Sequence, residues 1–173
     1  MHEQTTPNTI YKNALDWTDP KHFDLATISS DQEDRRIEKV VALFSNYTEA
    51  NLRNNLREVY ADRVYFRDAF KQLASAEAVE SYMLAGLKPL DQAEFVFNRV
   101  AVTEGNYYFD WTMRLDFKKT PQGSWEESIG ISHMRFDLED KVIFHQDYWD
   151  PTDIVYRRIP IAKQLISLVK SKL

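Results

Sequence analysis

A run of four alternating segments between Gln92 and Asp150 constrains the fold of this chain more than any other feature. The segments are AEFVFNRVAV, NYYFDWTMRLDFK, WEESIGISHMRFD and KVIFHQDYWD, and each has the apolar–polar alternation of a half-buried β-strand. The breaks between them are short: Glu104-Gly105, Thr120 to Ser124, and Leu138 to Asp140. Because short breaks favour hairpins, we expect these segments to form an antiparallel meander.

Helical patterns stand before this predicted sheet. One helix is expected after a capping box at Ser30, a second opens near Thr48, and a third is capped by Ser75. The segment DRVYFRDAF, between the second and third helices, has the β-branched and aromatic residues of a short strand. A terminal helix is predicted from Ile159 to Leu173, with Pro160 at its start.

This order of elements predicts an α+β domain, because helices that follow one another cover one face of an antiparallel sheet. We expect a curved antiparallel sheet wrapped around a cone-shaped pocket, with the N-terminal helices over it and a C-terminal helix added. Residues 1–30 are interpreted as an N-terminal arm, packed through Tyr11, Leu15 and Trp17. Residues 31–173 are interpreted as a single domain, which is long enough to bury a core.

Composition excludes several classes of function. The chain has no cysteine, so disulfides, thiolate catalysis and cysteine metal sites are ruled out. A net charge of −5 argues against nucleic-acid binding, which needs a basic surface. The first twenty residues lack the apolar core of a secretory signal, and no apolar run approaches the ~20 residues that span a bilayer. We therefore expect a cytoplasmic protein without a membrane partner.

The last predicted strand, VIFHQDYW, carries the clearest candidate chemistry. Alternation places Ile143, His145, Asp147 and Trp149 on one face of this strand. If that face lines the pocket, the carboxyl and the imidazole are neighbours and can share a mobile proton, which suits general acid–base catalysis. The structural alternative is a buried Asp–His hydrogen bond that only braces the pocket wall.

Other candidates come from neighbouring segments. Asp68 would project into the pocket from the end of its strand, two residues after Phe66, or it would simply cap the turn before Phe70. Trp111 and Met113, on the long second strand of the meander, would be plain core or apolar pocket lining. Further ligand contacts are expected from Phe66 itself and from two residues on other segments, Tyr82 on the third helix and Ser132 on the third strand of the meander.

No cofactor is predicted. His145, Asp147 and Asp68 could converge, but no metal-binding spacing such as HExxH supports a metal site. The four glycines are scattered, so no glycine-rich loop is present to hold phosphates.

Two stretches, VYADRVYFRDAF and ISHMRFDLEDKVIFHQDYWD, resemble the nuclear-transport-factor-2-like superfamily, and within it the SnoaL-like, ketosteroid-isomerase and limonene-epoxide-hydrolase groups. The resemblance covers roughly residues 32–156. It implies the cone fold, but that fold hosts isomerases, dehydratases, cyclases, hydrolases and non-catalytic binding modules.

The resemblance also implies positions for functional residues. Asp68 falls where the isomerases hold their proton-shuttling carboxylate, and Asp147 falls where the hydrolases hold the carboxylate that protonates the epoxide oxygen. Ser132 falls where the isomerases keep a protonated aspartic acid as oxyanion donor. His145 and Trp149 fall on the pocket wall.

The sequence departs from both catalytic patterns. The isomerase tyrosine should lie near Phe44, which has no hydroxyl, and a serine replaces the oxyanion acid. The arginine–aspartate pair of the hydrolases is replaced around Trp111 and Met113.

Three functions therefore stay open. The first is a cofactor-free acid–base enzyme acting on a small hydrophobic oxygenated compound, with Asp147, Asp68 and His145 as the catalytic groups. The second is a carrier with the same pocket and no turnover, and the third is a scaffold whose cone is filled by its own side chains. The outward residues Ile129, Ile131 and His133 suggest a homodimer through the convex face of the sheet.

Overall fold

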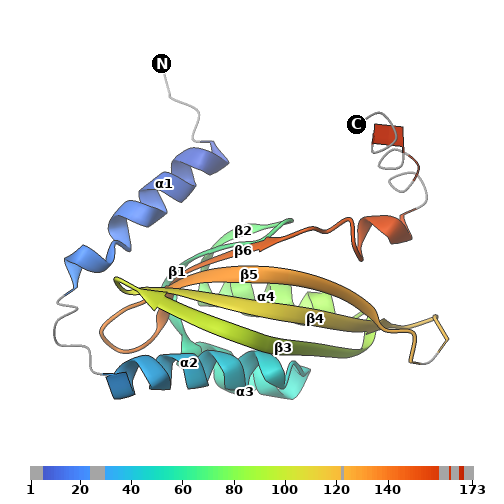
Figure 1. Cartoon of the computed structure of the whole chain (residues 1–173), viewed down its shortest axis with the longest axis horizontal. Coiled ribbons are helices and arrows are strands. Elements are labelled where there is room, and N and C mark those ends of the chain that lie inside the picture. The colour runs from blue at the N-terminus through green and yellow to red at the C-terminus, as the bar shows by residue number, and fades with distance from the viewer. Residues whose placement is uncertain (1–5, 24–29, 122, 160–163, 165–167, 170–173) are drawn as a thin grey trace.

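A computed structural model describes residues 6–23, 30–121, 123–159, 164 and 168–169 of this chain. The described residues form one sheet with helices on both of its sides (Figure 1). The elements are α1 (Pro7–Trp17), η1 (Pro20–His22), α2 (Ser30–Ser45), α3 (Glu49–Val59), β1 (Tyr60–Arg67), β2 (Gln72–Ser75), α4 (Ala76–Leu87), β3 (Leu90–Thr103), β4 (Asn106–Phe117), β5 (Glu126–Phe136), β6 (Val142–Trp149) and η3 (Tyr156–Arg158).

Local sequence signals explain where several of these elements begin. The Thr48 hydroxyl accepts a hydrogen bond from the Asn51 amide at 3.3 Å, and the Ser75 hydroxyl accepts one from the Ala78 amide at 3.2 Å. Each satisfies an amide that the first turn of a helix leaves unpaired. The predicted cap at Ser75 is therefore confirmed, and Thr48 is the N-cap of α3, where a helix was expected to open.

The predicted meander is also present. β3, β4, β5 and β6 pair antiparallel in chain order. The β3–β4 turn uses Glu104 and Gly105 with φ of 47° and 73°, the left-handed pair that a tight hairpin needs. The predicted hairpins therefore form where the sequence places them.

The sheet as a whole is mixed rather than purely antiparallel, which corrects the prediction. Its order is β2-β1-β6-β5-β4-β3, and β1 runs parallel to β6, with Phe66 opposite His145. A parallel neighbour requires a crossover connection, which β2, α4 and β3–β5 supply here. β2, a four-residue strand that pairs with β1, was not predicted from the sequence.

The two ends of the chain differ from the predictions as well. The N-terminal arm contains a helix, α1, whose N-cap is Thr6. The last element after β6 is the short 3-10 helix η3, so the predicted C-terminal helix is not found among the described residues. Most of its range, 159–173, lies outside the described residues.

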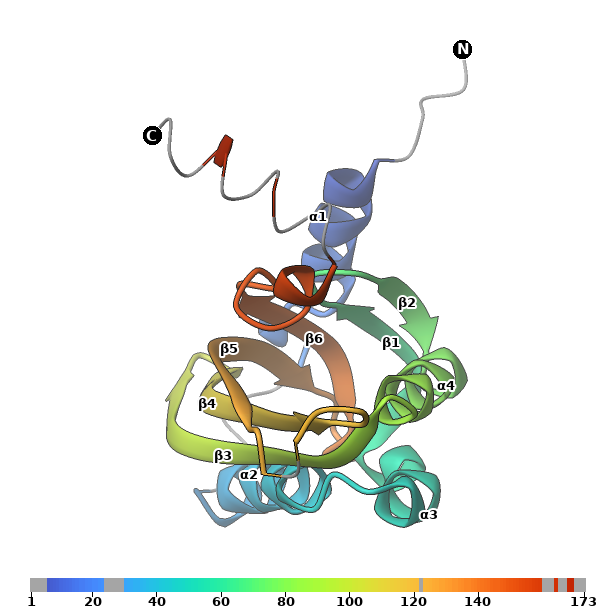
Figure 2. The ribbon, with the colours of Figure 1, turned by 90° about the vertical axis from the view of Figure 1, so that its right-hand side faces the viewer.

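The sheet curls so that α2, α3 and α4 lie on its inner side and α1 on its outer side (Figure 2). The inner side holds the main core, to which α3 contributes Leu52, Leu56 and Val59, each almost inaccessible to solvent. Full burial of such side chains stabilises the fold by about 1.5–3 kcal/mol each. None of the described helices has the length and apolar character needed to cross a membrane.

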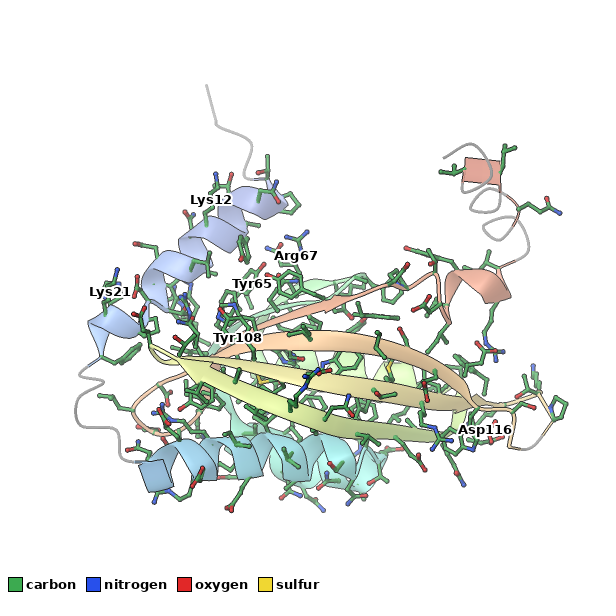
Figure 3. All side chains as sticks on the ribbon, in the orientation of Figure 1. Lys12, Lys21, Tyr65, Arg67, Tyr108 and Asp116 are labelled. Carbon is green, nitrogen blue, oxygen red and sulfur yellow. The ribbon has the colours of Figure 1, made fainter. Side chains whose placement is uncertain are left out.

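α1 packs on the outer face of the sheet through Ala14 and its neighbours. They contact Tyr65 of β1 and Phe144 of β6 in a second, smaller cluster. Figure 3 shows Tyr65 on the side of the sheet where α1 lies. The helix is also held by polar contacts, because Arg135 on β5 donates to the Leu15 carbonyl at 2.8 Å. The predicted packing through Tyr11, Leu15 and Trp17 is thus observed, although in a helix rather than a loose segment.

Candidate functional site

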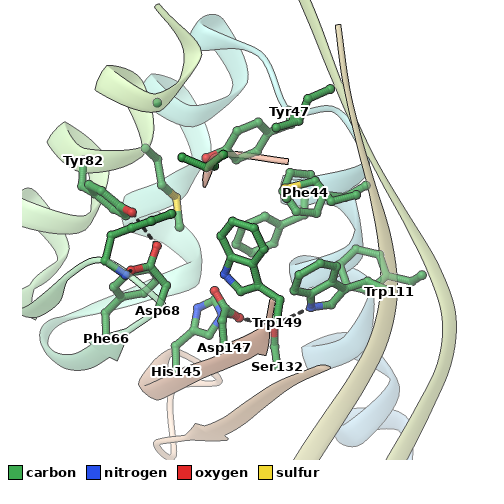
Figure 4. A pocket seen from close by; sticks show the side chains of 18 of the residues that line it. Phe44, Tyr47, Phe66, Asp68, Tyr82, Trp111, Ser132, His145, Asp147 and Trp149 are labelled. Carbon is green, nitrogen blue, oxygen red and sulfur yellow. Dashed lines mark hydrogen bonds and ion pairs between the residues drawn. The ribbon is translucent and has the colours of Figure 1, made fainter. Parts of the chain in front are cut away.

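A cavity of about 200 Å³ lies between the inner face of the sheet and helices α2 and α4. All nine residues predicted as site residues line it: Phe66, Asp68, Tyr82, Trp111, Met113, Ser132, His145, Asp147 and Trp149. They come from β1 and the residue that follows it, and from β4, β5, β6 and α4, elements far apart in the sequence (Figure 4). The cone is therefore hollow rather than filled by its own side chains, which removes the main argument for a pure scaffold.

The alternation of β6 places its polar side chains at the cavity. His145, Asp147 and Trp149 point inward, whereas Phe144 packs under α1 on the outer face. The predicted parity fails at the start of the strand, where Val142 joins the main core. A register shift against β5 at this point inserts an extra residue and reverses the side on which the next side chain lies.

A chain of hydrogen bonds runs along the floor of the cavity. The Tyr60 hydroxyl lies 2.6 Å from His145 Nδ1, and His145 Nε2 lies 2.7 Å from Asp147 Oδ1. The Ser132 hydroxyl donates to the same Asp147 oxygen at 2.5 Å and accepts from Trp111 Nε1 at 2.9 Å. His145 and Ser132 thus hold one carboxylate oxygen directly, and Tyr60 and Trp111 hold those two side chains in turn.

The chain assigns the tautomer of His145. Burial and the negative charge of Asp147 raise the pKa of Tyr60 well above its ordinary value, so the phenol keeps its proton. The buried O–H has His145 Nδ1 as its hydrogen-bond partner among the described residues, so Nδ1 accepts. Nε2 then carries the imidazole hydrogen and donates it to Asp147.

The second oxygen of Asp147 is arranged differently from the first. Oδ2 has no hydrogen-bond partner within the described part of the chain, and the side chain is 17% exposed at the cavity wall. One oxygen is therefore anchored, and the other is free to accept a proton or a hydrogen bond.

Asp68 fits both interpretations made from the sequence. Its Oδ1 accepts from the amides of Phe70 and Lys71 at 2.8 and 2.7 Å, which is a turn cap. Its Oδ2 accepts from the Tyr82 hydroxyl at 2.5 Å and faces the cavity. Three donors therefore contact the oxygens of Asp68 and fix the orientation of its carboxylate.

Tyr47 also lines the cavity, although it was not among the predicted site residues. Its ring lies 6.0 Å from that of Phe44 and 5.0 Å from that of Phe95, and its hydroxyl has no hydrogen-bond partner among the described residues. Burial, then the negative charges of Asp147 and Asp68, raise the pKa of this phenol. The hydroxyl therefore stays protonated and can donate to a ligand.

The sequence carried a signal for Tyr47, because it stands three residues after Phe44 and continues the inner face of α2 beyond the end of the helix. It supplies the hydroxyl that is missing at Phe44. Tyr60 carried no such signal. The helical spacing of the apolar residues before it placed Tyr60 on the apolar side of α3, whereas Tyr60 is the first residue of β1.

The position of Trp111 depends on Gly130, its direct partner on β5. A Cβ at residue 130 would overlap the six-membered ring of Trp111 and stand 2.9 Å from its Cζ3. The missing side chain lets the indole lie flat against the sheet and reach Ser132. Within the described residues, no group of three or more His, Asp or Glu side chains is placed to hold a metal ion.

Comparisons with known proteins identify the fold that carries this cavity. No protein-family model matches the chain, and no curated protein matches it either. Solved structures do match. An NTF2-like protein from Burkholderia thailandensis has a TM-score of 0.60 at 12% identity, covering 73% of this chain and 96% of its own. The fold is nuclear-transport-factor-2-like.

Other structures with the NTF2-like fold differ in what they do. An epoxide hydrolase like limonene epoxide hydrolase, from M. tuberculosis, matches with a TM-score of 0.54 at 12% identity, covering 79% of this chain and 94% of its own. A protein with a ketosteroid-isomerase-like fold from Catenulispora acidiphila, in complex with trimethylamine, matches with a TM-score of 0.59 at 14% identity, covering 68% and 89%. The NTF2-like fold also includes proteins assigned as hydroxylase, polyketide cyclase and isomerase. At these identities the likeness defines the fold of this chain and leaves its activity open.

Proposed function

We propose that this protein is a cofactor-free acid–base enzyme, of the isomerase, dehydratase, cyclase or hydrolase type, acting on a small hydrophobic oxygenated compound. One observation carries the proposal: Asp147 is anchored through Oδ1 while Oδ2 stands free at the wall of a largely apolar cavity. A carboxylate in that state can take a proton from a bound molecule or from a water beside it.

The other side chains of the cavity have distinct tasks in this proposal. Asp147 Oδ2 accepts a proton from a C–H or O–H bond of the substrate or from the attacking water. Tyr47 donates a hydrogen bond to the substrate oxygen on which negative charge develops. The proton on Asp147 then returns to the substrate or to the leaving oxygen, so the enzyme ends in its starting state.

His145, Tyr60 and Ser132 act through Asp147. His145 and Ser132 donate to Oδ1 and thereby hold the plane of the carboxylate, and Tyr60 keeps His145 in the donating tautomer. The resemblance implied an oxyanion donor at Ser132. Because the single hydroxyl proton of Ser132 goes to Asp147, the geometry favours Ser132 as a positioning residue and Tyr47 as the oxyanion donor.

The apolar lining supports the class of substrate. Trp111, Met113, Phe66 and Trp149 line the cavity, and the two indoles lie edge-on to neighbouring rings, so an apolar compound with one or two oxygen groups fits it. Exclusion of water by such walls strengthens the electrostatic interactions of Asp147 with a bound molecule.

The proposal is tested with Asp147→Asn. A panel of small epoxides, cyclic enones and β-hydroxy ketones is screened for turnover by the wild-type protein, and binding and turnover are then measured for the variant. We expect Asp147→Asn to retain binding and to lose turnover by about 10²–10⁴-fold. Tyr148→Phe, an outward substitution on the same strand, is the matched control and should leave turnover unchanged. Unchanged turnover in Asp147→Asn would mean that this carboxylate is not the base.

A carrier without turnover is the second candidate, and the predominantly apolar lining favours it. The NTF2-like protein that holds trimethylamine illustrates a bound small molecule in this fold. Native mass spectrometry of the protein purified from its own host discriminates the two. A carrier should copurify with an intact hydrophobic compound that it does not convert on prolonged incubation.

We also propose a homodimer through the outer face of the sheet. Ile129 and Ile131 on β5 are 67% and 46% exposed, and Val96 on β3 is 49% exposed, so an apolar surface stands beside the area covered by α1. A two-fold contact would bury it. Light scattering during size exclusion should give twice the chain mass for the wild type and the chain mass for Ile131→Asp. A wild-type monomer at micromolar concentration would refute the dimer.

A further inference from the structure

The charges around the cavity do not balance. Two carboxylates, those of Asp68 and Asp147, line it, and among the described residues no lysine or arginine does. His145 is the only basic side chain among the described lining residues, and both of its ring nitrogens are engaged, Nδ1 with Tyr60 and Nε2 with Asp147. A bound molecule therefore meets two carboxylates and no lysine or arginine of the described lining.

The field of these carboxylates extends across the cavity. After burial and, for Tyr82, its own hydrogen bond to Asp68, the negative charges of Asp68 and Asp147 are among the causes that raise the pKa of both Tyr47 and Tyr82. Tyr47 lies just beyond α2 and Tyr82 lies on α4, so the field of the carboxylates reaches both helical walls of the cavity. Because charge burial without a partner is costly, a ligand of positive charge gains in such a space and an anion is excluded.

The walls are suited to hold a cation without a rigid ion pair. Nine of the 20 lining residues are aromatic. Phe70 lies edge-on to Trp149 at 5.6 Å, and Phe95 lies edge-on to Trp111 at 5.8 Å, so these ring pairs meet at steep angles. Figure 4 shows the two indoles at the cavity. Ring faces attract an organic cation within about 6 Å of the centroid, most strongly where water is excluded.

We infer that the natural ligand of this cavity is a hydrophobic organic cation, a compound with a tertiary amine or quaternary ammonium group held among the aromatic rings. Asp68 is its counter-ion, because three hydrogen bonds fix this carboxylate at the cavity wall, while Asp147 Oδ2 is left for proton transfer. The inference deepens the proposed function and rests on it for the claim that such a cation is turned over. Its binding is a separate, measurable property.

The test compares choline, a permanent cation, with its neutral isostere 3,3-dimethylbutan-1-ol and with the anion 3,3-dimethylbutanoate, by titration calorimetry at pH 7. The shape of the three probes is nearly constant, so differences in Kd report charge. We expect choline to bind at least about 10-fold more tightly than the neutral alcohol and the anion not to bind detectably.

Two variants locate the effect. In Asp68→Asn the amide oxygen can still cap the turn, so the fold is retained, and we expect the preference for choline over the alcohol to fall to about 2-fold or less. Asp62→Asn removes the same charge from an exposed position on β1 and should leave the preference unchanged. A wild type that binds the alcohol as tightly as choline, or that does not bind choline at millimolar concentration, overturns the inference. So does a preference that survives in Asp68→Asn.

The outcome is distinguishable from failure of the proposed chemistry. Asp147→Asn should keep a preference for choline, because Asp68 remains, while losing turnover of any identified substrate. Cation preference without a turnover defect in Asp147→Asn would support the ligand class and refute the acid–base role. A turnover defect in Asp147→Asn without a preference for choline in the wild type would support the acid–base role and refute the ligand class.

Discussion

Gly130 provides a sharp test of how the cavity floor is built. A side chain at this position must overlap the indole of Trp111, which lies flat across the glycine and donates to the Ser132 hydroxyl at 2.9 Å. Gly130→Ala therefore displaces the indole and breaks this hydrogen bond. Since Ser132 also donates to Asp147, the change reaches the proposed base through one intermediate side chain.

The magnitude of the effect follows from three contributions. Overpacking a buried site costs about 1–3 kcal/mol, and loss of the indole hydrogen bond costs about 1 kcal/mol. The lower backbone entropy of alanine in the unfolded chain offsets about 0.5–1 kcal/mol of this. We expect a net loss of about 2 kcal/mol in the free energy of unfolding, which at a urea slope of about 2 kcal/mol/M lowers the midpoint by about 1 M.

The assay is urea denaturation followed by tryptophan fluorescence, and the matched control is Gly86→Ala. Gly86 lies in α4, and a Cβ there meets no atom within 4 Å. Alanine should stabilise the helix by about 0.5–1 kcal/mol at this site. If Gly130→Ala and Gly86→Ala shift the midpoint in the same direction, the close approach of Trp111 to Gly130 is not a constraint on the fold.

Two further substitutions test the polar contacts outside the cavity. Arg36, 2% exposed, donates to Asp140 at 2.7 Å, so Arg36→Met should lower the free energy of unfolding by about 3–5 kcal/mol, measured by urea denaturation. Arg53→Met, at an exposed ion pair, is the control and should lower it by less than about 0.5 kcal/mol. Similar losses in the two variants would refute this. Burial and the charge of Arg135 lower the pKa of His133 to about 4. The unfolded chain therefore protonates this histidine at a higher pH than the folded protein does, and stability falls as the pH drops from about 6.5 towards 4. The loss in the free energy of unfolding is on the order of 2 kcal/mol after an allowance for solvent screening. Between pH 7 and 4.5, the stability of His133→Gln should depend on pH less steeply than that of the wild type. Identical pH dependence in the two proteins would refute the lowered pKa of His133.

The prediction of the meander succeeded because its causes are local. Alternation, short breaks and the caps at Thr48 and Ser75 are properties of a few neighbouring residues, and they identified the strands β3 to β6 and the starts of α3 and α4. The alternation of β6 likewise identified the inward side chains His145 and Asp147. It failed at Val142, where a register shift against β5 reverses the alternation and only the partner strand reveals it.

The errors have physical causes of the same kind. The parallel pairing of β1 with β6 joins residues about 80 positions apart, and no local pattern reports it. The helix α1 is stabilised by packing on Tyr65 and Phe144, so its sequence alone reads as a weak element. Tyr60 donates to a histidine that lies 85 residues further along the chain, and so its part in the site could not be inferred from its neighbours.

The sequence by itself determined the secondary structure of the meander, the face of β6 that turns inward, and the identity of the two carboxylates at the cavity. These follow from side-chain period and turn chemistry, which act over a few residues. Only the tertiary structure decided that Asp147 has one anchored and one free oxygen, that Asp68 is held by Tyr82, and that Tyr47 supplies a hydroxyl. Those properties depend on distances between side chains from different elements, and the closure of the curved sheet sets these distances.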